Sequence, residues 1–420
     1  MIGSFLGSFV IFGPIVTLFL GACYLSVAPL FLSDENSIRT DSFFVAIAFG
    51  VLLAGLLYVL AKIAQLSGEL VVPIAFITLS VVNAVRHKGV LMPSFTLSSY
   101  PASIVFALLF LVFCGSVLVG SLMMGIGEYP HVFFNGDTPL RLTHAYEIVR
   151  MSDYPPEALT TKDIYRPYHY GGPASVAVLA AITGLALHKA MFLVVLPILL
   201  VGSFSAVCWL SRVFFKRAGS QYAAILLVIP FVKFGDEIYS RFILDTIQLG
   251  VGPTSIRLLD EIRWLNDFDP ENFSKGIWDV TATAGMFLLV VSCIFMARAQ
   301  KAQILIAAPI IILLTYFSKV TITPAAAVLL AVGLLFRWRE IGFKVFITYV
   351  VIAGSASIFL LSQLGAFDVV GASVTVNSPG QIVQTISSDN RYAQEYLAEI
   401  VFASMLAVLF FVLWLFSDVL

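Results

Sequence analysis

The feature of this sequence that most restricts its fold is the length of its stretches without a charged residue. No Asp, Glu, Lys or Arg occurs in residues 1–33, 42–61 or 89–127. A helix rises about 1.5 Å per residue, so about 20 apolar residues cross a hydrocarbon core of about 30 Å. Charged residues make up 12% of the chain and hydrophobic residues 60%, whereas soluble domains carry about 25% charged residues. The chain is therefore built for a bilayer, and a water-soluble enzyme is excluded.

Apolar runs of this length predict an all-α polytopic membrane protein with about eleven transmembrane helices. The alternating apolar and polar pattern of a membrane β-barrel is absent from the sequence, so the spans are interpreted as helices. The predicted spans are Phe5 to Leu32, Ser42 to Ala61, Leu70 to Ala84, Ala102 to Met124, Ala190 to Ser211, Ala218 to Val232, Val280 to Ala297, Ala302 to Ser318, Val320 to Phe336, Val345 to Gly365, and Ile400 to Phe416.

A further apolar stretch, Pro173 to Leu187, decides the orientation of everything that follows it. It is short for a span and ends at His188 and Lys189. If it does not cross, the basic clusters of the short loops share one face, which the positive-inside rule makes cytoplasmic. Those clusters are Arg86 and Lys88, then Arg212, Lys216 and Arg217, then Arg298 and Lys301, then Arg337, Arg339 and Lys344. We therefore expect a helix that is half-inserted from the outer side.

With this orientation, most of the polar residues lie outside the membrane in three long loops. These loops run from about Gly125 to Gly172, from about Lys233 to Trp278, and from about Ala366 to Glu399. Long ordered loops are usually functional. The second loop mixes apolar and charged residues, which predicts amphipathic helices at the membrane interface.

The first outer loop contains a row of ionisable residues on a predicted helix. Asp137 or Thr138 at the N-cap and Pro139 in the first turn are helix start signals. At spacings of three and four, Asp137, Arg141 and His144 fall broadly along one face. A carboxylate there can deprotonate an acceptor, while Arg or His counters the charge of a phosphate.

A structural interpretation of the same residues stays open. Asp137 can serve only as a helix cap, and Arg141 can simply pair with Asp137 or Glu147. A single His, such as His144, is more often a hydrogen-bonded structural residue than a catalyst.

The order of features around this loop resembles the glycosyltransferase C (GT-C) superfamily. A membrane helix is followed by the acidic start of an outer loop, an amphipathic helix, and a return rich in Pro and aromatic residues, Ile164 to Pro173. A short apolar helix and a span that ends in basic residues come next. The resemblance covers roughly Ala102 to Val320. Three spans precede its first helix, and Asp137 lacks the adjacent second acid that many members carry.

The resemblance implies an enzyme that takes a sugar from a polyprenyl-phosphate donor and passes it to an acceptor on the outer face. Asp137 matches the acidic residue that acts as base or positions the acceptor, and Asp236 and Glu237 match a second acidic position in the next outer loop. Lys319 resembles a basic position that meets a lipid phosphate. The complete set of expected substrate-binding residues is Arg141, His144, Arg166, Tyr168, His169, Tyr170, Arg241, Lys319 and Arg391.

The expected organisation has three parts: a three-span extension in residues 1–100, a GT-C-like catalytic module with two large outer loops in 101–320, and further spans with a third outer loop in 321–420. The expected activity is inverting glycosyl transfer to a glycan, lipid or protein acceptor, in the cell membrane and on its outer side. Its partners are the polyprenyl-phosphate sugar and membrane lipid, and a net charge of -1 argues against nucleic acid.

Two other functions and one cofactor are alternatives. A lipid-linked polysaccharide polymerase or ligase has similar loops but relies on their Arg and His residues. A transporter or flippase predicts internal repeats and ionisable residues within the spans, neither of which the sequence shows. Asp267 and Asp269 resemble a divalent-cation site, although EF-hand spacing is missing and solvated acids or helix caps are the simpler interpretation. No cofactor is otherwise indicated.

Overall fold

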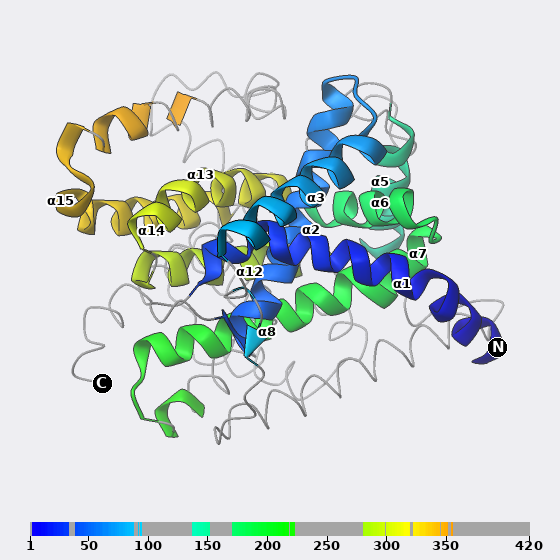
Figure 1. Cartoon of the computed structure of the whole chain (residues 1–420), viewed down its shortest axis with the longest axis horizontal. Helices are drawn as coiled ribbons and strands as arrows, with labels where there is room; N and C mark the ends of the chain where they lie inside the picture. Colours follow the sequence, from blue (N-terminus) through cyan, green and yellow to red (C-terminus); the bar gives the residue numbers. More distant parts are fainter. Residues whose placement is uncertain are drawn as a thin grey trace, which may run out of the picture.

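The structure is a computed structural model of the chain. It describes residues 2–32, 38–87, 91, 93–94, 137–151, 170–217, 219–222, 280–298, 300–319, 322–344, 346–351 and 354–355. This part is helical (Figure 1), apart from two short parallel strands, β1 (Ile38–Arg39) and β2 (Pro93–Ser94).

The helices follow the apolar runs of the sequence. They are α1 (Ile2–Val27), η1 (Ala28–Phe31), α2 (Thr40–Ile63), α3 (Gly68–His87), α5 (Asp137–Arg150), α6 (Gly171–Thr183), α7 (Leu187–Lys189), the π-helical η2 (Ala190–Val195), α8 (Leu196–Phe214), α12 (Val280–Arg298), α13 (Lys301–Ser318), α14 (Thr323–Phe336) and α15 (Trp338–Ile341).

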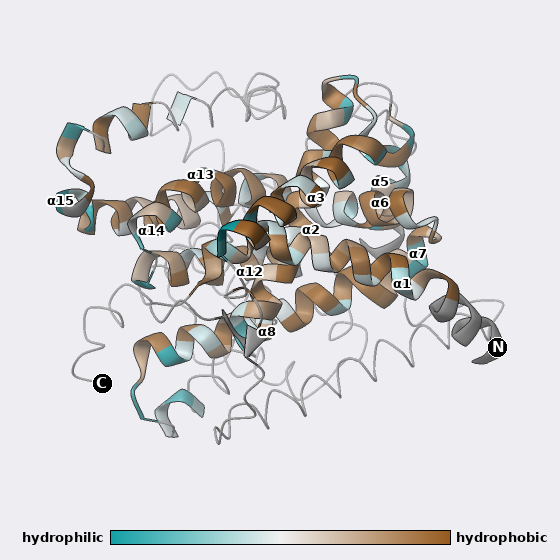
Figure 2. Cartoon of the chain, in the orientation of Figure 1, coloured by the Kyte–Doolittle hydropathy of each residue, from teal (hydrophilic) through white to brown (hydrophobic). Residues whose placement is uncertain are grey.

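Four helical segments in the described ranges are long and apolar enough to cross a membrane, which fits a membrane-embedded protein. They are Ile11–Phe31, Thr40–Ile63, Gly68–His87 and Leu187–Phe214. Figure 2 shows that hydrophobic residues dominate these helices. The predicted spans Ala102 to Met124 and Ile400 to Phe416 lie outside the described residues, as do most of Ala218 to Val232 and of Val345 to Gly365. The total of eleven spans therefore stays a prediction.

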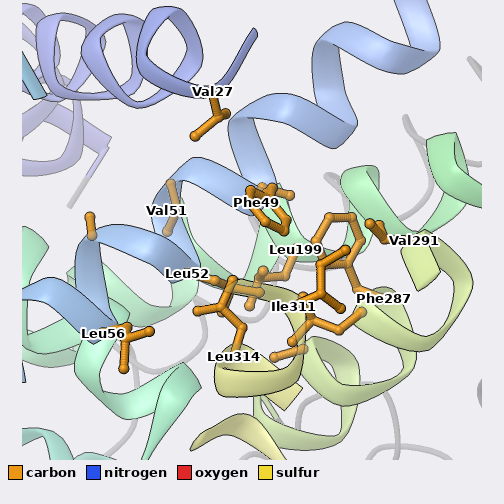
Figure 3. Close-up of a cluster of buried hydrophobic side chains, with 14 of the residues drawn as sticks. Val27, Phe49, Val51, Leu52, Leu56, Leu199, Phe287, Val291, Ile311 and Leu314 are labelled. Carbon is orange, nitrogen blue, oxygen red and sulfur yellow. The ribbon is translucent and has the colours of Figure 1, made fainter. Parts of the chain in front are cut away.

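The core forms where α2, α8, α12 and α13 meet. Buried side chains from all four helices converge there, including Phe49, Leu199, Phe287 and Ile311 (Figure 3). Close helix contact in membranes relies on small residues. At Gly202 of α8, for example, a Cβ atom would collide with the Cβ atom of Ala48 in α2.

One end of the bundle gathers basic residues. Arg212, in the last turn of α8, forms an ion pair with Asp41 in the first turn of α2. Arg337, at the end of α14, donates from Nη1 to the carbonyl oxygen of Met296 at 2.9 Å, close to Arg298 at the end of α12. This is the end that the positive-inside rule predicts to face the cytoplasm.

Helix α6 lies in the opposite half of the bundle. It has 13 residues, about 20 Å of helix at about 1.5 Å per residue. Gly171 at its start packs against Ser318 at the end of α13, and Gly184, just after its end, lies near Phe12 in the first half of α1. Gly184 has a φ of 75°, which lets the chain turn back toward α7. Both ends of α6 thus lie in the same half of the bundle, and its half-insertion from the outer side stays a prediction.

Candidate functional site

Helix α5 turns three polar side chains toward the bundle at the end remote from the Asp41–Arg212 pair. Arg141 is 5% exposed, Glu147 is 4% exposed, and His144 between them is partly buried, with its Nδ1 atom shielded from solvent. Tyr146 and Arg150 lie on the exposed face of the same helix. Because burying charge inside a membrane protein is unfavourable, such residues usually mark a functional site.

The start of α6 completes one wall of this site. Tyr170 is buried, and its ring meets that of His144 edge to face, with 5.3 Å between ring centroids. Burial and, as the smaller cause, the positive charge of Arg141 together lower the pKa of His144 to about 4. Burial also raises the pKa of the Tyr170 phenol, with a smaller contribution from the Glu147 carboxylate. Both rings are therefore uncharged at neutral pH.

The end of α13 supplies a second cation. Lys319 is only 8% exposed, and its backbone N–H donates to the carbonyl oxygen of Thr315 at 2.7 Å. Its side chain passes over Gly285 of α12, where a Cβ atom would lie 2.8 Å from the Lys319 Cβ atom. Ser318 is fully buried against Gly171, the residue after Tyr170. The helix ends thus bring distant parts of the sequence into one place.

We call the side chains assembled in this way the buried polar cluster. It consists of Arg141, His144, Glu147, Tyr170, Ser318 and Lys319. Two members are cations, one is an acid, and three are neutral hydrogen-bonding groups. This combination suits a ligand that carries an anionic group beside neutral polar groups.

A network at the turn between α2 and α3 fixes the end of α5. Lys62 donates from Nζ to the carbonyl oxygen of Val149 at 3.2 Å, and a positive charge is favourable at a helix C-terminus. Lys62 also lies 3.5 Å from Oε1 of Glu69, which accepts a hydrogen bond from the Tyr58 hydroxyl at 2.7 Å. This network sets the position of the helix that carries three of the cluster residues.

The structure brings together four of the residues expected at the site: Arg141, His144, Tyr170 and Lys319. Asp137 is the first residue of α5, as its helix start signals predict, but its side chain lies outside the described part. The remaining expected site residues also lie outside it: Arg166, Tyr168, His169, Asp236, Glu237, Arg241 and Arg391.

Sequence reasoning missed Glu147, Ser318 and Lys62 as contributors. Glu147 continues the spacing of three that links Arg141 to His144, so the helical pattern carried a signal for it. Ser318 and Lys62 have no such signal, because only tertiary packing brings them to the site.

Within the described ranges, no group of three or more His, Cys, Asp or Glu side chains is placed to hold a metal ion. Asp267 and Asp269 lie outside those ranges. No protein-family model matches this chain, and no curated protein or solved structure matches it at a significant level.

Proposed function

We propose that this protein is a GT-C-type membrane glycosyltransferase that moves a sugar from a polyprenyl-phosphate donor to an acceptor hydroxyl at the outer face of the membrane. One observation carries the proposal. The buried polar cluster includes three side chains of the helix that begins at Asp137, and it lies at the end of the bundle predicted to be outermost. Buried ionisable groups in membrane proteins commonly mark substrate sites.

In the proposed reaction, the acceptor oxygen attacks the anomeric carbon of the sugar from the face opposite the phosphate. The bond between that carbon and the phosphate oxygen breaks, and polyprenyl phosphate leaves. Asp137 takes the proton of the acceptor hydroxyl, with Asp236 and Glu237 on the acceptor side. Arg141 and Lys319 stabilise the charge that develops on the leaving phosphate, assisted by His169 or Arg241. Such electrostatic stabilisation is usually the largest catalytic contribution.

The distribution of charge supports an enzyme over a transporter. Transporters place ionisable residues near the middle of their spans, where the substrate binds. In the described spans, the charged side chains lie at the ends, as Asp41, Lys62 and Arg212 do. A lipid-linked polysaccharide polymerase or ligase stays the alternative within the same class, and it would rely on the Arg and His residues of the outer loops.

The test replaces Asp137 with Asn and measures the release of the lipid phosphate, which forms whichever acceptor receives the sugar. Membranes containing the protein receive undecaprenyl-phosphate-linked glucose, galactose, mannose or arabinose, and released undecaprenyl phosphate is measured. Asn caps a helix about as well as Asp, so α5 should form normally and only the base is lost. Because general-base catalysis contributes about 10²–10⁴-fold, we expect release to fall at least about 100-fold.

Asp153→Asn, a change of the same kind in the same loop, is the matched control and should leave release unchanged. Retained activity in Asp137→Asn, with normal expression and a single gel-filtration peak, removes Asp137 from the mechanism. If the wild-type protein releases no undecaprenyl phosphate from any donor, the proposed function is wrong.

A further inference from the structure

In each of two neutral side chains of the buried polar cluster, His144 and Ser318, one polar atom has no hydrogen-bond partner among the described residues. Within the part of the chain that the structure describes, neither Nδ1 of His144 nor Oγ of Ser318 is hydrogen-bonded, and both atoms are buried. Proteins rarely leave buried polar atoms unsatisfied, so each such atom calls for an explanation. A bound ligand that supplies the missing hydrogen-bond partners is an explanation that can be tested.

The two atoms lie along one continuous stretch of contacts. The ring of His144 meets that of Tyr170, and the next residue, Gly171, packs directly on Ser318. A Cβ atom at Gly171 would lie 2.8 Å from the Cα atom of Ser318, so no side chain separates the two backbones. Ser318 is followed by Lys319, whose side chain is also buried. The neutral polar groups therefore border a cation.

The chemistry of these groups favours a hydroxyl over an anion. His144 is uncharged at neutral pH because burial and Arg141 lower its pKa to about 4. A neutral imidazole offers one N–H donor and one lone pair, and a Ser hydroxyl both donates and accepts. A sugar hydroxyl has the same dual capacity, whereas an ionised phosphate only accepts and is better met by Lys319. The site is thus suited to a molecule with hydroxyls beside an anionic group.

We propose that His144 and Ser318 form the subsite that binds the hydroxyls of the donor sugar, next to the phosphate held by Lys319. This inference rests on the proposed function and extends it, because it assigns sugar recognition to residues distinct from the base. The subsite distinguishes a glycosylated lipid from the bare lipid phosphate.

Lipid binding by the purified protein in nanodiscs tests the inference. The probes are undecaprenyl phosphate and the same lipid linked through its phosphate to glucose, galactose, mannose or arabinose. The variants are His144→Phe, which keeps a ring against Tyr170 without its nitrogens, and Ser318→Ala. A neutral hydrogen bond accounts for about a three- to ten-fold change in affinity. We expect each variant to weaken binding of the preferred glycosylated lipid by that factor and to leave binding of the bare lipid within about two-fold.

Two matched controls separate recognition from general damage. His188→Phe changes an exposed His outside the cluster, and Ser292→Ala changes a buried Ser whose Oγ donates to the Leu288 carbonyl oxygen at 2.8 Å. Neither should alter binding of either lipid. His144→Gln, which restores a donor and an acceptor, should recover part of the affinity that His144→Phe loses.

The outcomes distinguish this inference from the function on which it rests. If the wild-type protein binds a glycosylated lipid and both variants bind it equally well, the subsite is wrong and the proposed function stands. If the variants weaken bare and glycosylated lipids alike, the two residues do not read the sugar and the inference is also wrong. If the wild-type protein binds none of the probes, the proposed function fails and the subsite fails with it.

Discussion

The contact between Gly171 and Ser318 joins α6 to α13 at the candidate site, and replacing Gly171 with Ala tests it. A Cβ atom at this position would lie 2.8 Å from Cα and 2.9 Å from Cβ of Ser318, with Oγ closer still. The Cα and Cβ atoms are fixed by the backbone, so no change of rotamer relieves the collision. One of the two helices must move for the methyl group to fit.

The expected size of the effect follows from two opposing contributions. Overpacking a close contact costs about 1–3 kcal/mol. Ala favours a helix over Gly by up to about 1 kcal/mol in the interior of a helix, and Gly171 is only the first residue of α6. We therefore expect a net loss of about 1–2 kcal/mol in the free energy of unfolding. Since about 1 kcal/mol shifts Tm by about 2–4 °C in domains of 150–250 residues, Tm should fall by a few degrees.

Thermal unfolding of the purified protein in detergent measures this change, and Gly21→Ala provides the contrast. Gly21 lies inside α1, and a Cβ atom there would meet nothing within 4 Å. Its replacement should leave Tm unchanged or raise it slightly. In a Ser318→Ala background, Gly171→Ala should cost less, because the Oγ collision disappears while the backbone collision remains. Equal Tm values for Gly171→Ala and Gly21→Ala would refute the packing of α6 on α13.

Two further predictions concern α5. Lys62→Met removes the charge that lies 3.2 Å from the Val149 carbonyl oxygen, so backbone amides in the last turns of α5 should exchange hydrogen faster, as measured by mass spectrometry. Lys62→Arg keeps the charge and should keep these amides protected. Unchanged exchange in Lys62→Met would contradict an anchoring role. The pKa of His144 is lowered from 6.5 to about 4 in the folded protein. Between pH 6.5 and 4 the His144 imidazole is therefore protonated in the unfolded state and neutral in the folded state. The free energy of unfolding consequently falls as the pH drops from 6.5 to 4. His144→Phe should lose this part of the pH dependence of Tm, while above pH 7 its Tm should change with pH as the wild-type Tm does. If the two proteins show the same change of Tm with pH over the whole range, His144 is not buried as described.

The helices of the described part were predictable because membrane helices follow simple rules. Apolar length decides where a span such as Ser42 to Ala61 begins and ends, and the observed α2 extends it by two residues at each end. The start of α5 at Asp137 follows from the Pro and capping signals around it. These features depend on neighbours in the sequence, so local patterns are enough to find them.

The candidate site was only partly predictable, because its geometry depends on contacts between distant segments. Nothing near Ser318 in the sequence indicates that it packs against Gly171, and nothing near Lys62 indicates that it meets the end of α5. Glu147 was visible as part of a helical face, yet only the structure shows that this face is buried. Residue type and spacing therefore located candidates, while tertiary packing decided which of them meet.

The two ends of the bundle use buried charge in different ways, and the difference bears on function. At the end predicted to be cytoplasmic, Asp41 and Arg212 balance each other and tie α2 to α8. In the buried polar cluster, Arg141 and Glu147 of α5 and Lys319 at the end of α13 are each more than nine-tenths buried. Burying ionisable groups inside a membrane protein is costly, and such groups commonly mark a substrate site. The proposed function therefore assigns the phosphate of the lipid-linked donor to Arg141 and Lys319, and a structural role to the Asp41–Arg212 pair.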